Sequence, residues 1–176
     1  MRDLSAAWIL GRPGGWLNQT VYDRLGLNPG INARGTYTDL GGSSLMPRVW
    51  AAVEQTNRYF AEMPELMRAT GAWIARLMEA EAARVTPGAS AAIVLGIAAC
   101  MTGTDGQRME QLPDTSGMKD EVAIQHGHRY KYDRMVRMTG ARLVEAGTSA
   151  GTSPGDLSSV IGSQTAAVFF PAHLDG

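Results

Sequence analysis

The chain has 176 residues, of which 44% are apolar and 19% charged, as is ordinary for one soluble globular domain with a hydrophobic core. Sixteen basic residues against seventeen acidic ones leave a net charge of −1, which argues against a nucleic-acid-binding surface. A single cysteine, Cys100, excludes an intrachain disulfide and favours a cytoplasmic protein, and no apolar run reaches the length of a membrane span.

Residues 1–30 are expected to form an irregular N-terminal arm, because proline and glycine interrupt them repeatedly. The apolar patch at 6–10 is too short for the core of a signal peptide. Its aromatic residues are expected to anchor the arm against the domain or a partner subunit; they are Trp8, Trp16 and Tyr22. Residues 31–176 are expected to form one domain, with a strand at 31–36 followed by a glycine-rich loop.

Two amphipathic helices follow. Pro47 suits the first turn of a helix over 48–60, and Pro64 suits the start of a second one. Apolar residues recur along the second helix at steps of three and four, which predicts a face packed into the core. These residues are Leu66, Met67, Thr70, Trp73, Ile74, Leu77 and Met78.

The segment from 82 to 101 contains the first candidate site. Ala82 to Thr86 suits a strand, Pro87 and Gly88 break it, and Ser90 opens a helix that is apolar all round and therefore predicted to be buried, together with Cys100. The free amides at such a helix start, with a serine hydroxyl beside them, can bind a phosphate. The alternative is a tight strand-to-helix turn that binds nothing.

The second half alternates strands and helices. A polar, glycine-broken loop at 102–119 precedes predicted strands at 121–125, 141–145 and 165–170. Between them lie a helix over 132–139 that ends at Gly140 and a helix that begins with Ser153 and Pro154. This order predicts an α/β fold with a mainly parallel sheet and flanking helices. Dinucleotide, nucleoside-triphosphate and hydrolase motifs are absent from the sequence.

Four stretches, read together, resemble the selenocysteine synthase-like family of fold-type I pyridoxal 5'-phosphate (PLP) enzymes, which includes seryl-tRNA(Sec) selenium transferase and D-glucosaminate-6-phosphate ammonia lyase. The resemblance runs from about Tyr22 to Phe170, and its strength lies in the order and spacing of the four stretches. They are Ile-Asn-Ala-Arg-Gly-Thr-Tyr-Thr at 31–38 with Leu-Gly-Gly-Ser at 40–43, Glu-Ala-Ala-Arg-Val-Thr-Pro-Gly-Ala-Ser-Ala-Ala at 81–92, Gln-His-Gly-His-Arg at 125–129, and Gly-Ala-Arg-Leu-Val-Glu-Ala-Gly at 140–147.

The resemblance implies roles for individual residues. Gly88, Ala89 and Ser90 match the loop that holds the cofactor phosphate, and His126 matches a residue placed to stack on the pyridine ring. Four more residues match positions near an anionic substrate: Asn32, Arg34, His128 and Arg129. The plainer alternative for His126 and His128 is that they are ordinary loop residues, and for Arg34 that it pairs with an acid. A zinc site is not expected, because His173 is the only other histidine.

The resemblance also implies a Schiff-base lysine and an aspartate that holds the pyridine nitrogen protonated. Both are expected beyond Phe170; Asp175 lies too early for the aspartate, and Lys119 and Lys131 do not match the lysine. We therefore expect about half of such an enzyme: the N-terminal part of the large domain, ending before the Schiff-base lysine.

The implied reaction is a β-elimination of the ammonia-lyase type on a small anionic amino acid or amino-sugar acid. The slightly negative charge favours this branch over the tRNA-acting one. The chain alone is expected to be inactive and poorly stable, and to act as a homo-oligomer or with a complementing chain that carries the C-terminal half. The alternatives are a non-catalytic fragment or subunit of a split PLP enzyme, and an unrelated α/β ligand-binding domain.

Overall fold

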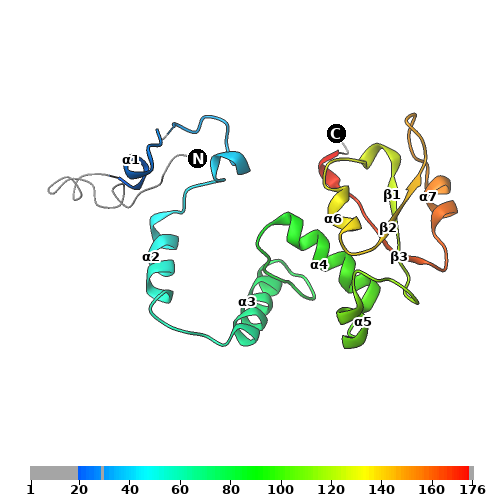
Figure 1. Ribbon diagram of the computed structural model, residues 1–176, viewed down its shortest axis with the longest axis horizontal. Coiled ribbons are helices and arrows are strands. Elements are labelled where there is room, and N and C mark those ends of the chain that lie inside the picture. The colour runs from blue at the N-terminus through cyan, green and yellow to red at the C-terminus, as the bar shows by residue number, and fades with distance from the viewer. Residues whose placement is uncertain (1–19, 29, 175–176) are drawn as a thin grey trace, which may run out of the picture. The chain divides into compact units, whose positions relative to one another are not determined.

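The computed structural model describes residues 20–28 and 30–174 (Figure 1). The chain consists of two units, residues 1–60 and 61–176. Each unit is considered by itself. Three residues discussed above, Trp8, Trp16 and Asp175, lie outside the described residues.

In the part of the first unit that the structure describes, the helices are α1 (Val21–Leu25), α2 (Pro47–Thr56) and a short 3-10 helix at Thr38–Leu40. Thr20 and Asp23 cap α1 by bonding to each other's backbone amides. The helix α2 begins at Pro47, as predicted. The strand predicted at 31–36 is wrong: this segment is a loop, in which Gly35 has a φ of 88° that does not suit an extended strand.

The second unit begins with three helices: α3 (Met63–Leu77), α4 (Ala89–Thr102) and α5 (Gly106–Gln111). The first two were predicted. The strand predicted at 82–86 is wrong, because this segment is irregular and its backbone lies against α3. A β-carbon at Gly71 of α3 would overlap the carbonyl oxygen of Ala83, so only glycine permits this approach.

The sheet confirms the predicted parallel arrangement. Its strands are β1 (Glu121–Gln125), β2 (Arg142–Ala146) and β3 (Thr165–Val168), in the order β2-β1-β3, and both pairings are parallel. The register pairs Glu121 with Arg142 and Ile124 with Glu145. Because all three strands run the same way, their carboxyl ends and the loops that come after them share one edge.

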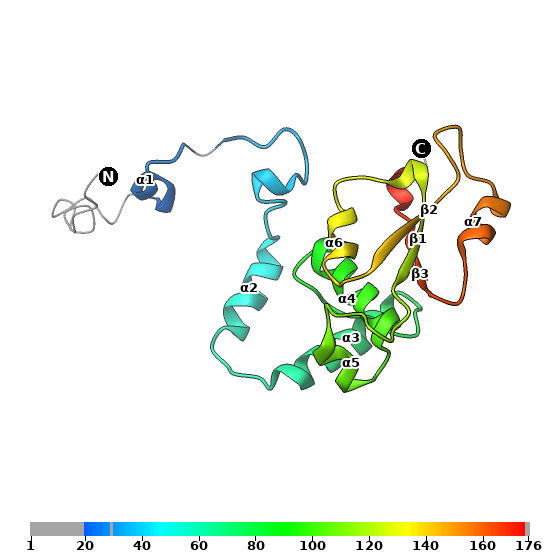
Figure 2. The same cartoon turned by 45° about the vertical axis from the view of Figure 1, so that its right-hand side comes forward.

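Helices cover both faces of the sheet, as the α/β prediction requires (Figures 1 and 2). The helices α4 and α6 (Asp133–Arg137) lie on one face, and α7 (Pro154–Val160) lies on the other. The core lies beneath α4 and α6, where apolar side chains from both helices meet β1. It consists of Ile97, Met101, Val122, Val136 and Ala141. Ser153 and Asp156 form a capping box at the start of α7, where the sequence predicted a helix.

The predicted burial of α3 and α4 is wrong for the described part of the chain. Along α3 only Gly71 and Ala75 are buried, and Trp73 is 57% exposed. Along α4 one stripe is buried, at Ile97, Met101 and Thr102, whereas Cys100 is exposed. The physical reason is that only one side of α4 meets the sheet. None of the described helices is both long and apolar enough to cross a membrane.

Candidate functional site

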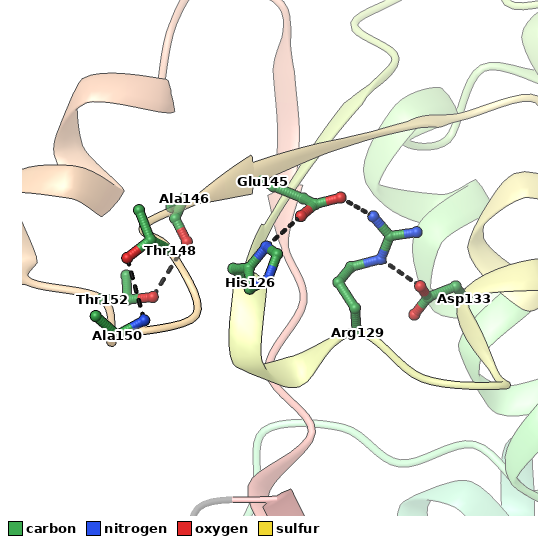
Figure 3. Close-up of polar contacts among 8 residues, drawn as sticks. All are labelled: His126, Arg129, Asp133, Glu145, Ala146, Thr148, Ala150 and Thr152. Carbon is green, nitrogen blue, oxygen red and sulfur yellow. Dashed lines mark hydrogen bonds and ion pairs between the residues drawn. The ribbon is translucent and has the colours of Figure 1, made fainter.

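The carboxyl edge of the sheet carries a row of interacting polar side chains (Figure 3). His126 begins a one-turn 3-10 helix, His126–His128, directly after β1, and Glu145 is the next-to-last residue of β2. The backbone register places Glu145 beside Ile124, so its carboxylate reaches the loop that carries the histidine. Adjacent parallel strands therefore bring together two residues that are nineteen positions apart.

Four residues form this row: His126, Glu145, Arg129 and Asp133. The Nδ1 atom of His126 lies 2.8 Å from Oε2 of Glu145. Arg129 donates from Nη1 to the other carboxylate oxygen of Glu145 and from Nε to Oδ2 of Asp133 (Figure 3). Asp133 also accepts from the backbone amide of Tyr130 at 3.3 Å, so the row is fixed to the first turn of α6.

Electrostatics keep Arg129 charged. The hydrogen bond that Arg129 donates to Asp133 raises the pKa of its guanidinium, and the negative charges of Asp133 and Glu145 add to this effect against the cost of burial. Two carboxylates flank one cation, so a substrate anion that bound Arg129 would have to compete with them. The predicted anion-binding role of Arg129 remains a prediction, in which the anion would share the guanidinium with Glu145 and Asp133.

The other histidine of the loop has different surroundings. His128 is only 4% exposed, and its ring packs edge-on against Phe170 with the centroids 4.9 Å apart. Tyr130 contacts His173 in a similar way at 5.1 Å, and burial raises the pKa of the Tyr130 hydroxyl. The predicted substrate-binding role of His128 remains a prediction, and in this structure the ring is part of the packing beneath the edge.

The loop after β2 borders the row of side chains. Thr152 donates its hydroxyl proton to the carbonyl of Ala146 at 3.1 Å, and the amide of Ala150 donates to the hydroxyl of Thr148 at 3.2 Å (Figure 3). Gly147 has a φ of 78°, and a β-carbon there would overlap the hydroxyl of Thr152. The loop is therefore folded tightly back on the end of β2.

The start of α4 is the second part of the candidate site. Gly88 occupies its N-cap with φ 105° and ψ 171°, a conformation essentially restricted to glycine. Space around this glycine is open, and the first turn of α4 contains no acidic side chain. The first intrahelical bond runs from the amide of Ala92 to the carbonyl of Gly88 at 3.1 Å. The earlier amides of the helix are therefore available to an anion, and this geometry fits a phosphate ester.

Asn32 and Arg34 belong to the first unit, where they shape a loop. The Asn32 side chain accepts from the amide of Arg34 at 2.9 Å and donates to the carbonyl of Gly35 at 2.6 Å. The guanidinium of Arg34 lies 4.6 Å from the ring centroid of Tyr37. A hollow of about 380 Å³ adjoins this loop, and Asn32 lines it. The Asn32 amide is therefore engaged in the turn, and Arg34 is exposed.

The lysines do not join either part of the site. The ammonium of Lys131 lies 5.3 Å from the ring centroid of its neighbour Tyr132, and Lys119 is in the loop before β1. Within the described residues, no three His, Cys, Asp or Glu side chains come close enough together to bind a metal ion.

Two residues of the row were missed by sequence reasoning, Asp133 and Glu145. Asp133 stands four positions after Arg129, a spacing at which opposite charges meet on a helix. Glu145 is a charged residue near the end of a half-buried strand. The spacing of Asp133 and the position of Glu145 could both be read from the sequence, but neither shows which residue each carboxylate binds.

Comparison with known proteins identifies relatives of the chain. No protein-family model matches. The chain is 37% identical, over 88% of its length, to a curated D-glucosaminate-6-phosphate ammonia lyase of Salmonella typhimurium, and 32% identical, over 85%, to a 5'-C-glycyluridine monooxygenase-decarboxylase of a Streptomyces species. A solved structure of D-glucosaminate-6-phosphate ammonia-lyase matches 86% of the chain with a TM-score of 0.81 and 36% identity. The chain spans 43% and 39% of the length of the two curated relatives. The family resemblance predicted from the motifs is therefore confirmed.

Proposed function

We propose that this chain, a homologue of part of D-glucosaminate-6-phosphate ammonia lyase, supplies the N-terminal part of the cofactor-binding domain of a PLP-dependent lyase. The observation that carries the proposal is the open start of α4, where Gly88 holds a conformation that presents backbone amides to an anion. The motif Gly88-Ala89-Ser90 lies in the region that resembles the family.

The residues of this chain would divide the task among them. The first amides of α4 and the Ser90 hydroxyl would hold the phosphate of the cofactor, and His126 would offer its flat ring to the pyridine. Arg34 is exposed and available for an anionic group of the substrate. When bound, PLP supplies an electron sink for the charge that develops as the α-proton of an amino substrate is removed. The covalent lysine is proposed to come from another segment or a complementing chain, because the positions of Lys119 and Lys131 do not match that of the Schiff-base lysine in the family pattern.

The proposed reaction is the elimination of ammonia from a small anionic amino acid or amino-sugar acid, in the cytoplasm. D-glucosaminate 6-phosphate is the first substrate to test, because a curated relative and a solved structure carry it in their names. We expect no ammonia release from the chain alone and measurable release once a chain carrying the remaining part of the relative is added. If the mixture binds PLP and releases no ammonia from this substrate, the substrate class is wrong and the cofactor site is not.

The binding site is tested with two alanine variants of one helix. Gly88→Ala forces a side chain into a backbone conformation that costs roughly 1–3 kcal/mol. Gly96→Ala is the matched control, because Gly96 lies in the middle of α4 and a β-carbon there meets open space. We expect Gly88→Ala to weaken PLP binding about tenfold or more, since about 1.4 kcal/mol corresponds to tenfold, and Gly96→Ala to leave it unchanged.

Equilibrium dialysis of PLP against the full chain provides the measurement, with ³¹P NMR to follow the phosphate. Pyridoxal, which lacks the phosphate, should bind far more weakly. Equal binding of PLP and pyridoxal, or equal affinity of the Gly88→Ala and Gly96→Ala variants, would contradict the proposed phosphate site.

A non-catalytic role is the second candidate. The exposed apolar side chains of α3 and α4, among them Trp73, Leu77 and Leu95, favour a subunit that contributes an interface and half a site. Size-exclusion chromatography separates the two candidates: a folded monomer that binds PLP argues for the first, and association without PLP binding argues for the second.

A further inference from the structure

The row at the carboxyl edge determines where His126 carries its proton. A carboxylate only accepts hydrogen bonds, and a guanidinium only donates them. Glu145 accepts from Arg129 with Oε1 and faces Nδ1 of His126 with Oε2. The contact of 2.8 Å is therefore an Nδ1–H donor on a carboxylate acceptor, which leaves Nε2 of the neutral imidazole with its lone pair.

The hydrogen bond also sets the direction of the ring. It lies along the plane of the imidazole, so it leaves the two flat faces uncovered by this contact. The His126 side chain is 45% exposed at the carboxyl edge, where parallel sheets bind their ligands. A ligand at this edge therefore meets either a flat aromatic face or the acceptor Nε2.

Arg129 is held by a buried partner. Its partner Asp133 has a side chain only 8% exposed, and that carboxylate also accepts from the amide of Tyr130. Arg129 thus joins a buried acid on α6 to Glu145 on β2. Its two carboxylate partners hold the guanidinium, and the guanidinium in turn holds the carboxylate that orients His126.

We propose that Glu145 and Arg129 are positioning residues that hold His126 as the Nδ1–H tautomer, with Nε2 presented as the acceptor for a hydrogen-bond-donating ligand group. The proposal deepens the proposed function and rests on it only for the identity of the ligand, a cofactor–substrate complex at the carboxyl edge. Arg129 acts here through Glu145.

The test is to read the tautomer of His126 directly by long-range ¹H–¹⁵N NMR on the full chain without cofactor. At about pH 8.5 free imidazole is neutral, and the two ring nitrogens then report which one is protonated. In the unaltered chain we expect the Nδ1–H tautomer. A predominantly Nε2–H imidazole in the unaltered chain would overturn the proposal without the need for any variant.

Glu145→Gln is expected to reverse the tautomer. Arg129 can only donate, so it takes the single amide oxygen of the glutamine, and the NH₂ group then faces Nδ1 of His126. Nδ1 must become the acceptor, and the proton moves to Nε2. An unchanged tautomer in Glu145→Gln would contradict the proposal. Glu145→Asp keeps the carboxylate and should retain the Nδ1–H form.

Glu121→Gln is the matched control. Glu121 makes the corresponding contact with Arg142 at the amino end of β1, so the same chemical change is made at the other edge of the sheet. It should leave the His126 signals in place, and the backbone amide spectrum should show that both variants fold. Because the measurement uses no cofactor, failure to bind PLP would count against the proposed function alone, and a wrong tautomer against this proposal alone.

Discussion

Two arginines stand at opposite edges of the same sheet, and each bridges two carboxylates. At the amino edge Arg142 donates from Nε to Asp120 at 3.1 Å and from Nη2 to Glu121 at 3.2 Å. At the carboxyl edge Arg129 bridges Asp133 and Glu145. The hydrogen bonds that the two guanidiniums donate to Asp133 and Asp120 raise the pKa of both arginines.

The two bridges differ in burial and in the contacts that extend beyond them. The Arg142 side chain is 61% exposed and ties β2 to Asp120 and Glu121, and Asp120 also accepts from the hydroxyl of Thr115 in the loop before β1. The Arg129 side chain is 32% exposed, and its bridge continues through Glu145 to His126. The same pairing of charges therefore serves strand alignment at one edge and the geometry of a candidate site at the other.

The largest expected effect comes from the backbone at the amino edge. Gly140 precedes β2 with a φ of 90°, and a β-carbon there would overlap the carbonyl oxygen of Pro113. Gly140→Ala should lower the free energy of unfolding by about 3 kcal/mol or more, because the backbone conformation alone costs a residue with a side chain roughly 1–3 kcal/mol and the overlap adds to it. Urea unfolding followed by circular dichroism measures the loss. Gly127→Ala at the carboxyl edge is the control, because a β-carbon at Gly127 meets open space; an equal loss there would refute the argument.

The next effect compares the acids of the two bridges. Asp133→Asn removes the buried partner of a half-buried cation and should cost about 2 kcal/mol, whereas Asp120→Asn should cost about 1 kcal/mol or less because Arg142 remains in water. Urea unfolding of the two variants checks the order. A larger decrease in the free energy of unfolding for Asp120→Asn than for Asp133→Asn would contradict this order.

Lowering the pH is expected to have a smaller effect on the free energy of unfolding. The hydrogen bond from Arg142 lowers the pKa of Asp120 below its ordinary value of 3.8. Its ionised form is therefore favoured by folding, so this contribution is complete above about pH 4 and is lost as the pH falls through the lowered pKa. The free energy of unfolding should fall between pH 5 and pH 3 by more in the unaltered chain than in Asp120→Asn. Parallel pH profiles of the two chains would show that Asp120 does not contribute.

The smallest expected effect is that of a charge-preserving change. Arg142→Lys should alter the free energy of unfolding by no more than about 0.5 kcal/mol, because exposed ion pairs contribute little. Arg129→Lys cannot reach two carboxylates with a planar fork, and it should disturb the His126 imidazole signals in the NMR spectrum. If both lysine variants leave those signals unchanged, the two bridges are equivalent.

The sheet was the most predictable part of the fold. Strand β1 was predicted with its observed bounds, and β2 and β3 to within two residues, because short apolar runs between turn signals are typical of parallel strands. The segment 82–86 has similar composition and is irregular, since a strand also needs a neighbour to receive its backbone hydrogen bonds. The composition of a segment indicates its tendency to form a strand, but it does not show whether a neighbouring strand is there to pair with it.

Burial and pairing were harder to predict. The apolar sequence of α4 predicts a helix but cannot specify which side meets the sheet, so Cys100 was wrongly expected to be buried. Arg129 was recognised as a charged residue near the site, whereas its partners depend on the register of β2 and on the turn that places α6. Pairing across elements is set by the fold as a whole.

The short helix α6 connects the carboxyl edge to the core. Asp133 at its first residue holds Arg129, and Val136, one turn later, is fully buried against the sheet. A molecule that settles on the edge and steadies Arg129 therefore also steadies the packing beneath it. Occupancy should raise the melting temperature of the whole second unit, so a thermal-shift screen of small anions and amines can report ligands without a label.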